Sequence, residues 1–336
     1  MFIFWILFLF LIVINCSRRN IRALNDVLAI KNIVSLRGIC AIEIVLGHIG
    51  LALPNELVMF PFRKAGILIV GIFFFLSGYG CFISLRNKEN YLDNFLKNKF
   101  IKLFLPVLFM YLVTELIKFL GNGSFLFENV FSFHNLFNTV NWYIWELFIF
   151  YFVFFVAFKI FDKKIGSFVI LLFCIVFICV CYYCKCDIPW YGSSICYPAG
   201  IYFAYFVNDL DRFINKNYYK CMGVGIIVLF ISISIFFINS SQNFLTLAIS
   251  RNVAALIFTL LTILLLKKFI IKNRFTEFLG RISFELYFIH FVFISFFHSI
   301  NFYVENNILY GLCVIFASVF LATILNKVNK IISKII

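Results

Sequence analysis

Charged residues are scarce in this 336-residue chain: Asp, Glu, Lys and Arg together make up 13% of it, against 64% for hydrophobic residues. Soluble globular proteins carry about a quarter charged residues and about a half apolar ones. The mean hydropathy of +1.03 also makes the chain more apolar than soluble proteins. This shortage of charge excludes a soluble globular protein. It predicts an all-α, polytopic membrane bundle, with the lipid bilayer as a partner.

Metal-binding and redox patterns are also missing. Eleven cysteines occur, but there is no CxxC pair and no pair of histidines at metal-ligand spacing, so we expect no metal. Most cysteines lie within apolar runs, where buried thiols are common. Cys184 and Cys186 flank Lys185 at the end of one run, and the sequence does not decide whether they form a disulfide. The fifty phenylalanines are spread along the chain and indicate lipid-facing helices rather than an aromatic ligand site.

Apolar runs of the length needed to cross a bilayer recur along the whole chain, with no soluble domain, repeat or linker between them. Residues 1–15 predict a short spanning helix with its N-terminus outside. A lipoprotein-type signal ending at Cys16 and an extension upstream of the true domain are the alternatives. Ten core spans follow, at residues 34–53, 66–84, 101–119, 141–161, 166–184, 193–207, 221–238, 245–266, 282–300 and 307–325.

The formal net charge is +14. Most basic residues fall in alternate loops, so the positive-inside rule explains the excess, and no nucleic acid is expected as a partner. The rule predicts an extra N-terminal transmembrane segment at 1–16, a cytoplasmic basic linker at 17–33, a membrane domain at 34–326 and a cytoplasmic basic tail at 327–336. The longest outside loop, at about 120–140, is expected to form a partly ordered cap.

The span at 34–53 carries Arg37, Glu43 and His48. A charged side chain near the bilayer centre costs about 2.5–3.5 kcal/mol, so such residues tend to face the bundle interior and to be functional. Helical geometry places Arg37 and His48 within about 20° of one another and about 16 Å apart along the axis. One face therefore carries a fixed cation near one membrane surface and a titratable base deeper in. Glu43 points about 140° away from His48 and needs another partner.

Two other spans contain polar groups with two interpretations each. Ser283, Tyr287 and His290 share one stripe of span 282–300, either as interhelical hydrogen bonds or as functional groups. The run Ser77-Gly78-Tyr79-Gly80 is expected to weaken its helix near the cytoplasmic face. Such a run lines a water-filled cavity or allows close helix packing.

The charged residues near the helix ends also have two interpretations each. The basic cluster before span 101–119 either sets topology and faces lipid or docks a polyanionic cytosolic ligand. It consists of Lys97, Lys99 and Lys102. Three charged residues lie toward the outer side: Glu115, Glu146 and Arg251. We expect them either to form structural ion pairs or to line the entrance for a polar acceptor.

Taken in order, these motifs resemble the membrane acyltransferase-3 family over about residues 31–325. The resemblance rests on Arg37 and His48 in LRG…GH, GIFFFLSGY at 71–79, the basic cluster before Pro106, Trp142-Tyr143, and Ser283/Tyr287/His290. Where the family commonly has Arg-x-x-Arg, this chain has Lys99 and Lys102, which keep the charge but lose bidentate contact with phosphate. The extra first span is a further departure, and we expect no fused esterase-like domain.

The resemblance implies a membrane-bound O-acyltransferase of the bacterial inner membrane, with a cytoplasmic C-terminus. It would transfer acetyl from cytosolic acetyl-CoA to a hydroxyl of a cell-surface carbohydrate or glycolipid. The sequence does not identify the acceptor or the oligomeric state. It also does not decide between acetyl and a longer acyl group such as succinyl. The expected catalytic residues are His48, Arg37, Tyr287, His290 and Ser283. The residues expected to bind the donor are Arg37, Lys97, Lys99, Lys102, Ser77 and Gly78.

Helix geometry and the resemblance predict the same mechanism. Coenzyme A held by its phosphates near Arg37 would reach His48 with its thioester. Burial disfavours the charged imidazolium, so His48 is expected to be a general base for the acceptor hydroxyl. A covalent acetyl-histidine is the competing route, and Tyr287 or Ser283 would donate to the oxyanion.

Two other classes of function compete with acyl transfer. The alternative is a transporter or flippase for a polysaccharide or a small solute, because intramembrane His, Glu and Arg residues also line translocation paths. A non-catalytic membrane sensor comes third. Dependence on acetyl-CoA separates the enzyme from both.

Overall fold

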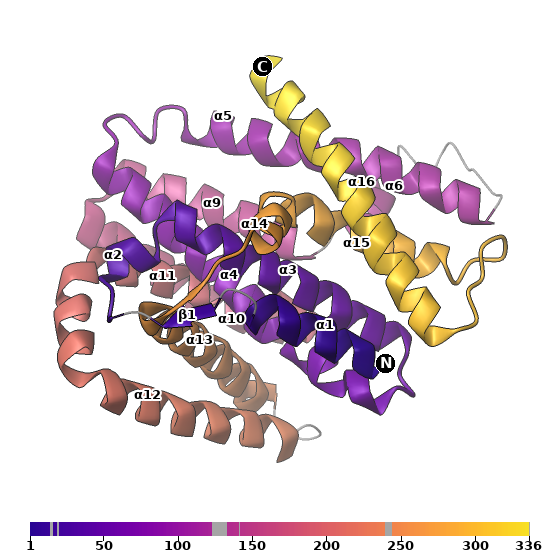
Figure 1. Cartoon of the computed structure of the whole chain (residues 1–336). Coiled ribbons are helices and arrows are strands. Elements are labelled where there is room, and N and C mark those ends of the chain that lie inside the picture. The colour runs from indigo at the N-terminus through magenta and orange to yellow at the C-terminus, as the bar shows by residue number, and fades with distance from the viewer. Residues whose placement is uncertain (14–15, 19, 123–132, 141, 239–243, 336) are drawn as a thin grey trace.

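The structure is a computed structural model that describes residues 1–13, 16–18, 20–122, 133–140, 142–238 and 244–335. Figure 1 shows that it is built almost entirely of helices, which confirms the predicted all-α membrane protein. In the described part, eight helices are long and apolar enough to cross a membrane, and a bent pair brings the number to nine.

All ten predicted core segments are helical. They are α3 (Ile30–Ala52), α4 (Phe60–Asn87), the continuous α5 (Phe95–Lys99), π-helix η2 (Phe100–Phe104) and α6 (Leu105–Asn122), α9 (Trp142–Ile160), α10 (Lys163–Tyr183), α11 (Cys196–Tyr205), α12 (Val207–Ile238), α13 (Phe244–Lys268), α15 (Ser283–Phe296) and α16 (Asn307–Ile335). The remaining elements are α1 (Phe2–Val13), α2 (Leu24–Val27), α8 (Phe133–Thr139), α14 (Arg274–Arg281), the 3-10 turns η1 (Leu57–Met59) and η3 (Ile188–Trp190), and the strands β1 (Cys16–Arg18) and β2 (Phe269–Ile271).

Two of the predicted spans are shorter than expected. The segment at 193–207 becomes α11 with 10 residues, and the segment at 282–300 becomes α15 with 14 residues. Neither reaches the roughly 20 residues of a full span. α15 instead follows α14 across a bend of 76°, where Ile282 leaves the helical conformation. A count of apolar residues does not detect such a bend.

The first segment is helical, as expected. α1 has 12 residues and packs alongside α3. The ring of Phe4 lies against Gly311 of α16, and Trp5 Nε1 donates a hydrogen bond to the Val58 carbonyl at 2.8 Å. The segment is therefore attached to the bundle by side-chain contacts as well as by its apolar surface.

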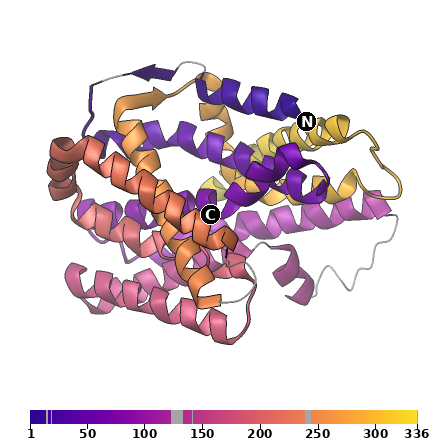
Figure 2. The same cartoon turned by 90° about the horizontal axis from the view of Figure 1, so that it is seen from below.

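Both predicted basic end segments contain regular secondary structure in their described residues. In the linker at 17–33, β1 pairs antiparallel with β2, and Cys16 lies opposite Ile271. Figure 2 shows both strands at the edge of the bundle. Residues 327–335, predicted as a tail, continue α16. Of the loop at 120–140, residues 123–132 lie outside the described residues, and α8 follows them.

α4 continues as a helix through Ser77-Gly78-Tyr79-Gly80, where the sequence analysis expected a weakened helix. A Cβ atom on Gly78 would meet the carbonyl oxygen of Tyr197 in α11, so the two backbones are in close contact there. Such an approach requires a residue without a side chain. Close packing is therefore the observed arrangement at Gly78.

Replacement of this glycine is expected to destabilise the bundle. Gly78→Ala forces a methyl group against the Tyr197 carbonyl, and overpacking of this kind costs about 1–3 kcal/mol. Gly80 has open space around its Cβ position, so Gly80→Ala should be neutral or stabilising by about 0.5–1 kcal/mol through helix propensity. Thermal unfolding of the two purified variants in detergent measures the contrast. Equal melting temperatures would contradict the close α4–α11 contact.

Candidate functional site

The site is centred on α3, most of which is buried. α15 packs against α3, and it brings His290 to His48. The His290 Nε2 atom lies 3.2 Å from His48 Nδ1. Each ring also has a backbone carbonyl of its own helix near Nδ1, Leu286 O at 3.0 Å for His290 and Ile44 O at 2.9 Å for His48. The stripe predicted on α15 therefore faces the functional face predicted on α3.

When both rings are neutral, these contacts assign their tautomers. A carbonyl oxygen only accepts, so His290 Nδ1–H donates to Leu286 O and its Nε2 atom is left as an acceptor. The neighbouring His48 Nδ1–H then points at both Ile44 O and His290 Nε2. The unprotonated nitrogen of His48 is therefore Nε2, which carries the lone pair that a general base requires.

The other end of the same interface holds Arg37. Its guanidinium donates to Ser283 Oγ at 3.1 Å, and Ser283 Oγ donates to Gly280 O at 3.0 Å. Arg37 therefore lies at the bend between α14 and α15. No Asp or Glu side chain in the described part of the chain forms a salt bridge with Arg37. The cation is half-buried, and its side-chain hydrogen bond is the one to Ser283.

Tyr287 lies between these two ends on α15. It is buried, its ring is 6.1 Å from the His290 ring, and the Tyr143 ring lies 5.2 Å away on its other side. Arg37, Tyr287 and His48 thus occur in sequence along one interface. The structure brings together all five residues of the predicted catalytic set: Arg37, Ser283, Tyr287, His290 and His48.

A cavity opens directly next to the histidine pair. Phe291 packs on both imidazoles, with ring centroids 4.3 Å from His48 and 4.2 Å from His290, and it also lines a cavity of about 650 Å³. We call this space the aromatic cavity. Its other lining residues include Trp142, Trp190, Phe137, Thr114, Asn135, Asn138, Thr139, Ser295, Lys118 and Asp187. Flat aromatic rings beside amides, hydroxyls and a carboxylate suit a polar ligand with an apolar face.

A second space lies among the lysines. It has a volume of about 530 Å³, and its lining includes Lys88, Lys99, Lys102, Asn94, Asn98 and Tyr151. We call it the basic cleft. Lys99 Nζ lies 3.9 Å from the Tyr151 ring centroid, and Tyr151 OH shares a hydrogen bond of 2.7 Å with Ser77 Oγ. Ser77 therefore supports the cleft wall, whereas Lys97 is exposed outside the lining and Gly78 packs on α11.

Comparison with protein families supplies the deciding observation. A family model described as an acyltransferase domain matches residues 30–327, from the first turn of α3 into α16. The chain belongs to the acyltransferase-3 family. Comparison with curated proteins finds no match, and neither does comparison with solved structures. Membership in the family makes the chain a membrane acyltransferase.

The other polar residues of this acyltransferase have mostly structural partners. Glu115 forms an ion pair with Lys118 at 2.7 Å. Glu146 is fully buried and accepts a hydrogen bond of 2.6 Å from Ser194. Glu43 is also buried, and neither of its carboxyl oxygens has a hydrogen-bond partner among the described residues. Cys184 and Cys186 are free thiols.

The loop between α10 and α11 of the acyltransferase is fixed beside the aromatic cavity. Asn252 Nδ2 donates to the Tyr191 carbonyl at 2.7 Å, and Asn252 Oδ1 accepts from Ile195 N at 3.1 Å. Burial raises the pKa of Tyr191 to about 12, so its hydroxyl stays neutral at physiological pH. These contacts hold the neighbouring Trp190 in the cavity wall.

Sequence reasoning named Lys99 and Lys102 of the basic cleft and Trp142 of the aromatic cavity, but it missed other wall residues of both spaces. Tyr151, Trp190 and Phe291 carry no motif, and they come from helices and loops far apart in the chain. Phe291 directly follows His290 in the sequence, and His290 belongs to the stripe already recognised. This adjacency was the one feature that could have indicated Phe291. The other two depend on how α9 and the loop before α11 pack.

Proposed function

We propose that this acyltransferase transfers acetyl from cytosolic acetyl-CoA to a hydroxyl group of a cell-surface carbohydrate. The basic cleft would receive the donor, and the aromatic cavity would receive the acceptor. The observation that carries the proposal is the His48–His290 pair, whose Phe291 neighbour is shared with the aromatic cavity.

The donor side is supported by charge. The cleft contains three lysines and one carboxylate, together with side-chain amides: Lys88, Lys99, Lys102 and Glu89. This net positive charge and the amides suit the phosphates and the adenosine of coenzyme A. Arg37, at the bend between α14 and α15, would supply a further cation to the donor. The positive-inside rule predicts that the lysine-rich end faces the cytosol, where acetyl-CoA is made available.

The acceptor side is supported by the mixture of aromatic and polar side chains. A sugar ring has an apolar face that packs on an aromatic ring and hydroxyls that bond to amides and carboxylates. Trp142 and Trp190 supply the rings, and Asn138 and Asp187 supply acceptors and donors. A pyranose bound there would place a hydroxyl next to Phe291 and the histidine pair.

The reaction then follows from the tautomer of His48. Its Nε2 atom takes the proton of the acceptor hydroxyl while the oxygen attacks the thioester carbonyl. The C–S bond breaks as the tetrahedral intermediate collapses, and the thiolate of coenzyme A takes the proton back from His48. The His290 Nε2 acceptor faces His48 Nδ1–H and stabilises the transient imidazolium, as the third group of a catalytic triad does. Tyr287 is the candidate donor to the oxyanion.

Substitution of two neighbouring lysines, one inside the basic cleft and one outside it, tests where the donor binds. Lys102 lines the basic cleft and Lys97 does not, although both side chains are exposed on the same short stretch. We expect Lys102→Met to raise the KM for acetyl-CoA about tenfold, as the loss of one charge-assisted hydrogen bond to phosphate would. Lys97→Met should change it less than about twofold, as expected for an exposed surface charge.

The assay uses membrane vesicles that hold matched amounts of each variant. Labelled acetyl-CoA is supplied to inverted or right-side-out vesicles together with several glycans, and label in the glycan fraction is counted. Transfer that requires access of acetyl-CoA to the cytoplasmic face supports the proposal. Label no greater than that of empty membranes, with any of the glycans, would contradict acetyl transfer and favour a transporter.

A further inference from the structure

A separate pocket lies where three helices meet, away from the histidine pair. The first turns of α4 supply Phe60, Lys64 and Leu68, α12 supplies Ile233, and α13 supplies Arg251. Its volume is about 320 Å³. α12 packs against α13, yet only a small part of α12 is buried, so it leaves a wedge that opens to the surrounding lipid.

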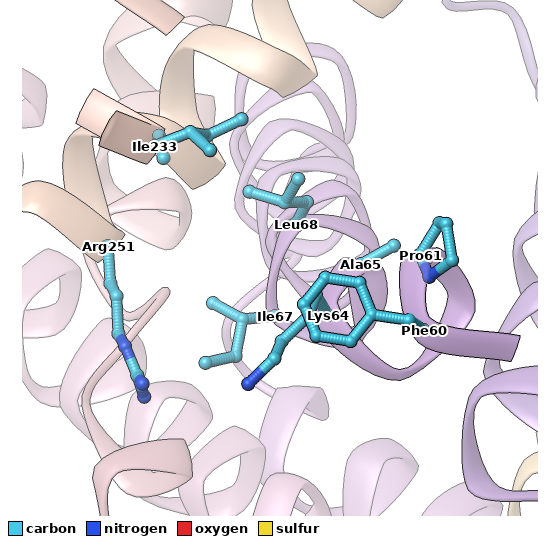
Figure 3. Close-up of a pocket in the computed structure, with 9 residues that line it drawn as sticks. Phe60, Pro61, Lys64, Ala65, Ile67, Leu68, Ile233 and Arg251 are labelled. Atoms are coloured by element: carbon cyan, nitrogen blue, oxygen red, sulfur yellow. The ribbon is translucent and has the colours of Figure 1, made fainter. Parts of the chain in front are cut away.

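The chemistry of this pocket is divided between its two ends. Figure 3 shows the charged ends of Lys64 and Arg251 directed toward the same end, on either side of Ile67, with Leu68 and Ile233 toward the other end. The Lys64 ammonium also lies 5.6 Å from the Phe60 ring centroid. Apart from the two cations, the described residues that line the pocket are apolar.

The depth of the cations fits the headgroup region of a bilayer. The span that contains α4 has 31 residues, so at about 1.5 Å per residue it exceeds the roughly 30 Å of a hydrocarbon core. Lys64 lies about 10 Å from the start of that span, and Arg251 lies about 8 Å from the start of the span at Thr246. Basic side chains at this depth meet lipid phosphates.

The geometry points to a binding site for an anionic phospholipid, with its phosphate between Lys64 and Arg251 and an acyl chain along Ile67, Leu68 and Ile233. Two cations at one end of an apolar pocket favour a net negative headgroup over a zwitterionic one, whose own cation they would repel. The lipid would fill the wedge that α12 leaves against α4 and α13. This site is independent of the acyl-transfer site.

Native mass spectrometry of the purified chain tests the site. Phosphatidylglycerol and phosphatidylcholine with identical acyl chains are titrated into the detergent-solubilised protein, and the bound fractions are compared. We expect phosphatidylglycerol to bind more tightly to the native chain. Lys64→Gln should weaken that binding about fivefold, and the double variant with Arg251→Gln about thirtyfold, whereas binding of phosphatidylcholine should change little.

Arg63→Gln is the matched control, because it removes one charge from the neighbouring position. Arg63 donates to the Pro54 carbonyl at 2.7 Å and does not line the pocket, so phosphatidylglycerol affinity should be unchanged. If the double variant does not fold, the phosphatidylglycerol affinities of the two single variants are compared with that of the native chain. Equal binding of both lipids to the native chain, or equal phosphatidylglycerol affinity in native and variant chains, would overturn the site. Full competition by inorganic phosphate would show a free-anion site instead.

Discussion

Replacement of His48 by glutamine is expected to reduce acetyl transfer about a thousandfold, within the range that a general base contributes. Glutamine is polar and of similar length, but it has no nitrogen lone pair to accept the hydroxyl proton. The KM for acetyl-CoA should change little, because the lysines that line the basic cleft are untouched. Initial rates at matched expression, with donor and acceptor varied separately, provide both quantities.

His298→Gln is the matched control for this substitution. The His298 ring stacks on Tyr310, with the centroids 4.0 Å apart, and in the described part of the chain it does not contact the His48–His290 pair. Transfer should therefore persist in His298→Gln. A His48→Gln chain that inserts, folds and still transfers acetyl at the native rate would remove His48 from the mechanism. Rapid formation of a protein-bound acetyl group in the native chain would instead favour the acetyl-histidine route.

The fold was predictable wherever apolar length alone decides it. Ten core segments were located correctly as helices because each is an apolar run flanked by polar or basic residues. The lengths of α11 and α15 were not predictable from hydropathy, since α15 is limited by the bend at Ile282. The strand pair of β1 with β2 joins residues that are more than 250 positions apart, and no local pattern encodes that pairing.

The site was predictable to the extent that helical periodicity places residues on one face. Spacing put Arg37 and His48 on one side of α3, and Ser283, Tyr287 and His290 on one side of α15. Spacing could not show that the two faces meet, which depends on the packing of α3 with α15. The orphan carboxyl group of Glu43 shows the same limit, because the sequence required a partner and none of the described residues provides one.

Replacement of Arg37 is the second change with a large expected effect. Arg37→Gln should raise the KM for acetyl-CoA about thirtyfold to a hundredfold, because a charge-assisted contact with phosphate is worth about 1.5–3 kcal/mol. Arg37→Lys should recover part of the loss, since an ammonium keeps the charge without the planar fork. Steady-state kinetics with acetyl-CoA as the varied substrate measure this series.

Ser283→Ala separates the charge of Arg37 from its hydrogen bond. The variant removes the hydroxyl that accepts from Arg37 but leaves the guanidinium in place, so its effect on KM should stay below about tenfold, because the charge that binds phosphate is kept. The KM and kcat values then assign the role. A rise in KM at constant kcat places Arg37 on the bound donor, because uniform binding was lost. A fall in kcat at constant KM would instead assign Arg37 to the oxyanion of the transition state and would contradict the donor-binding role.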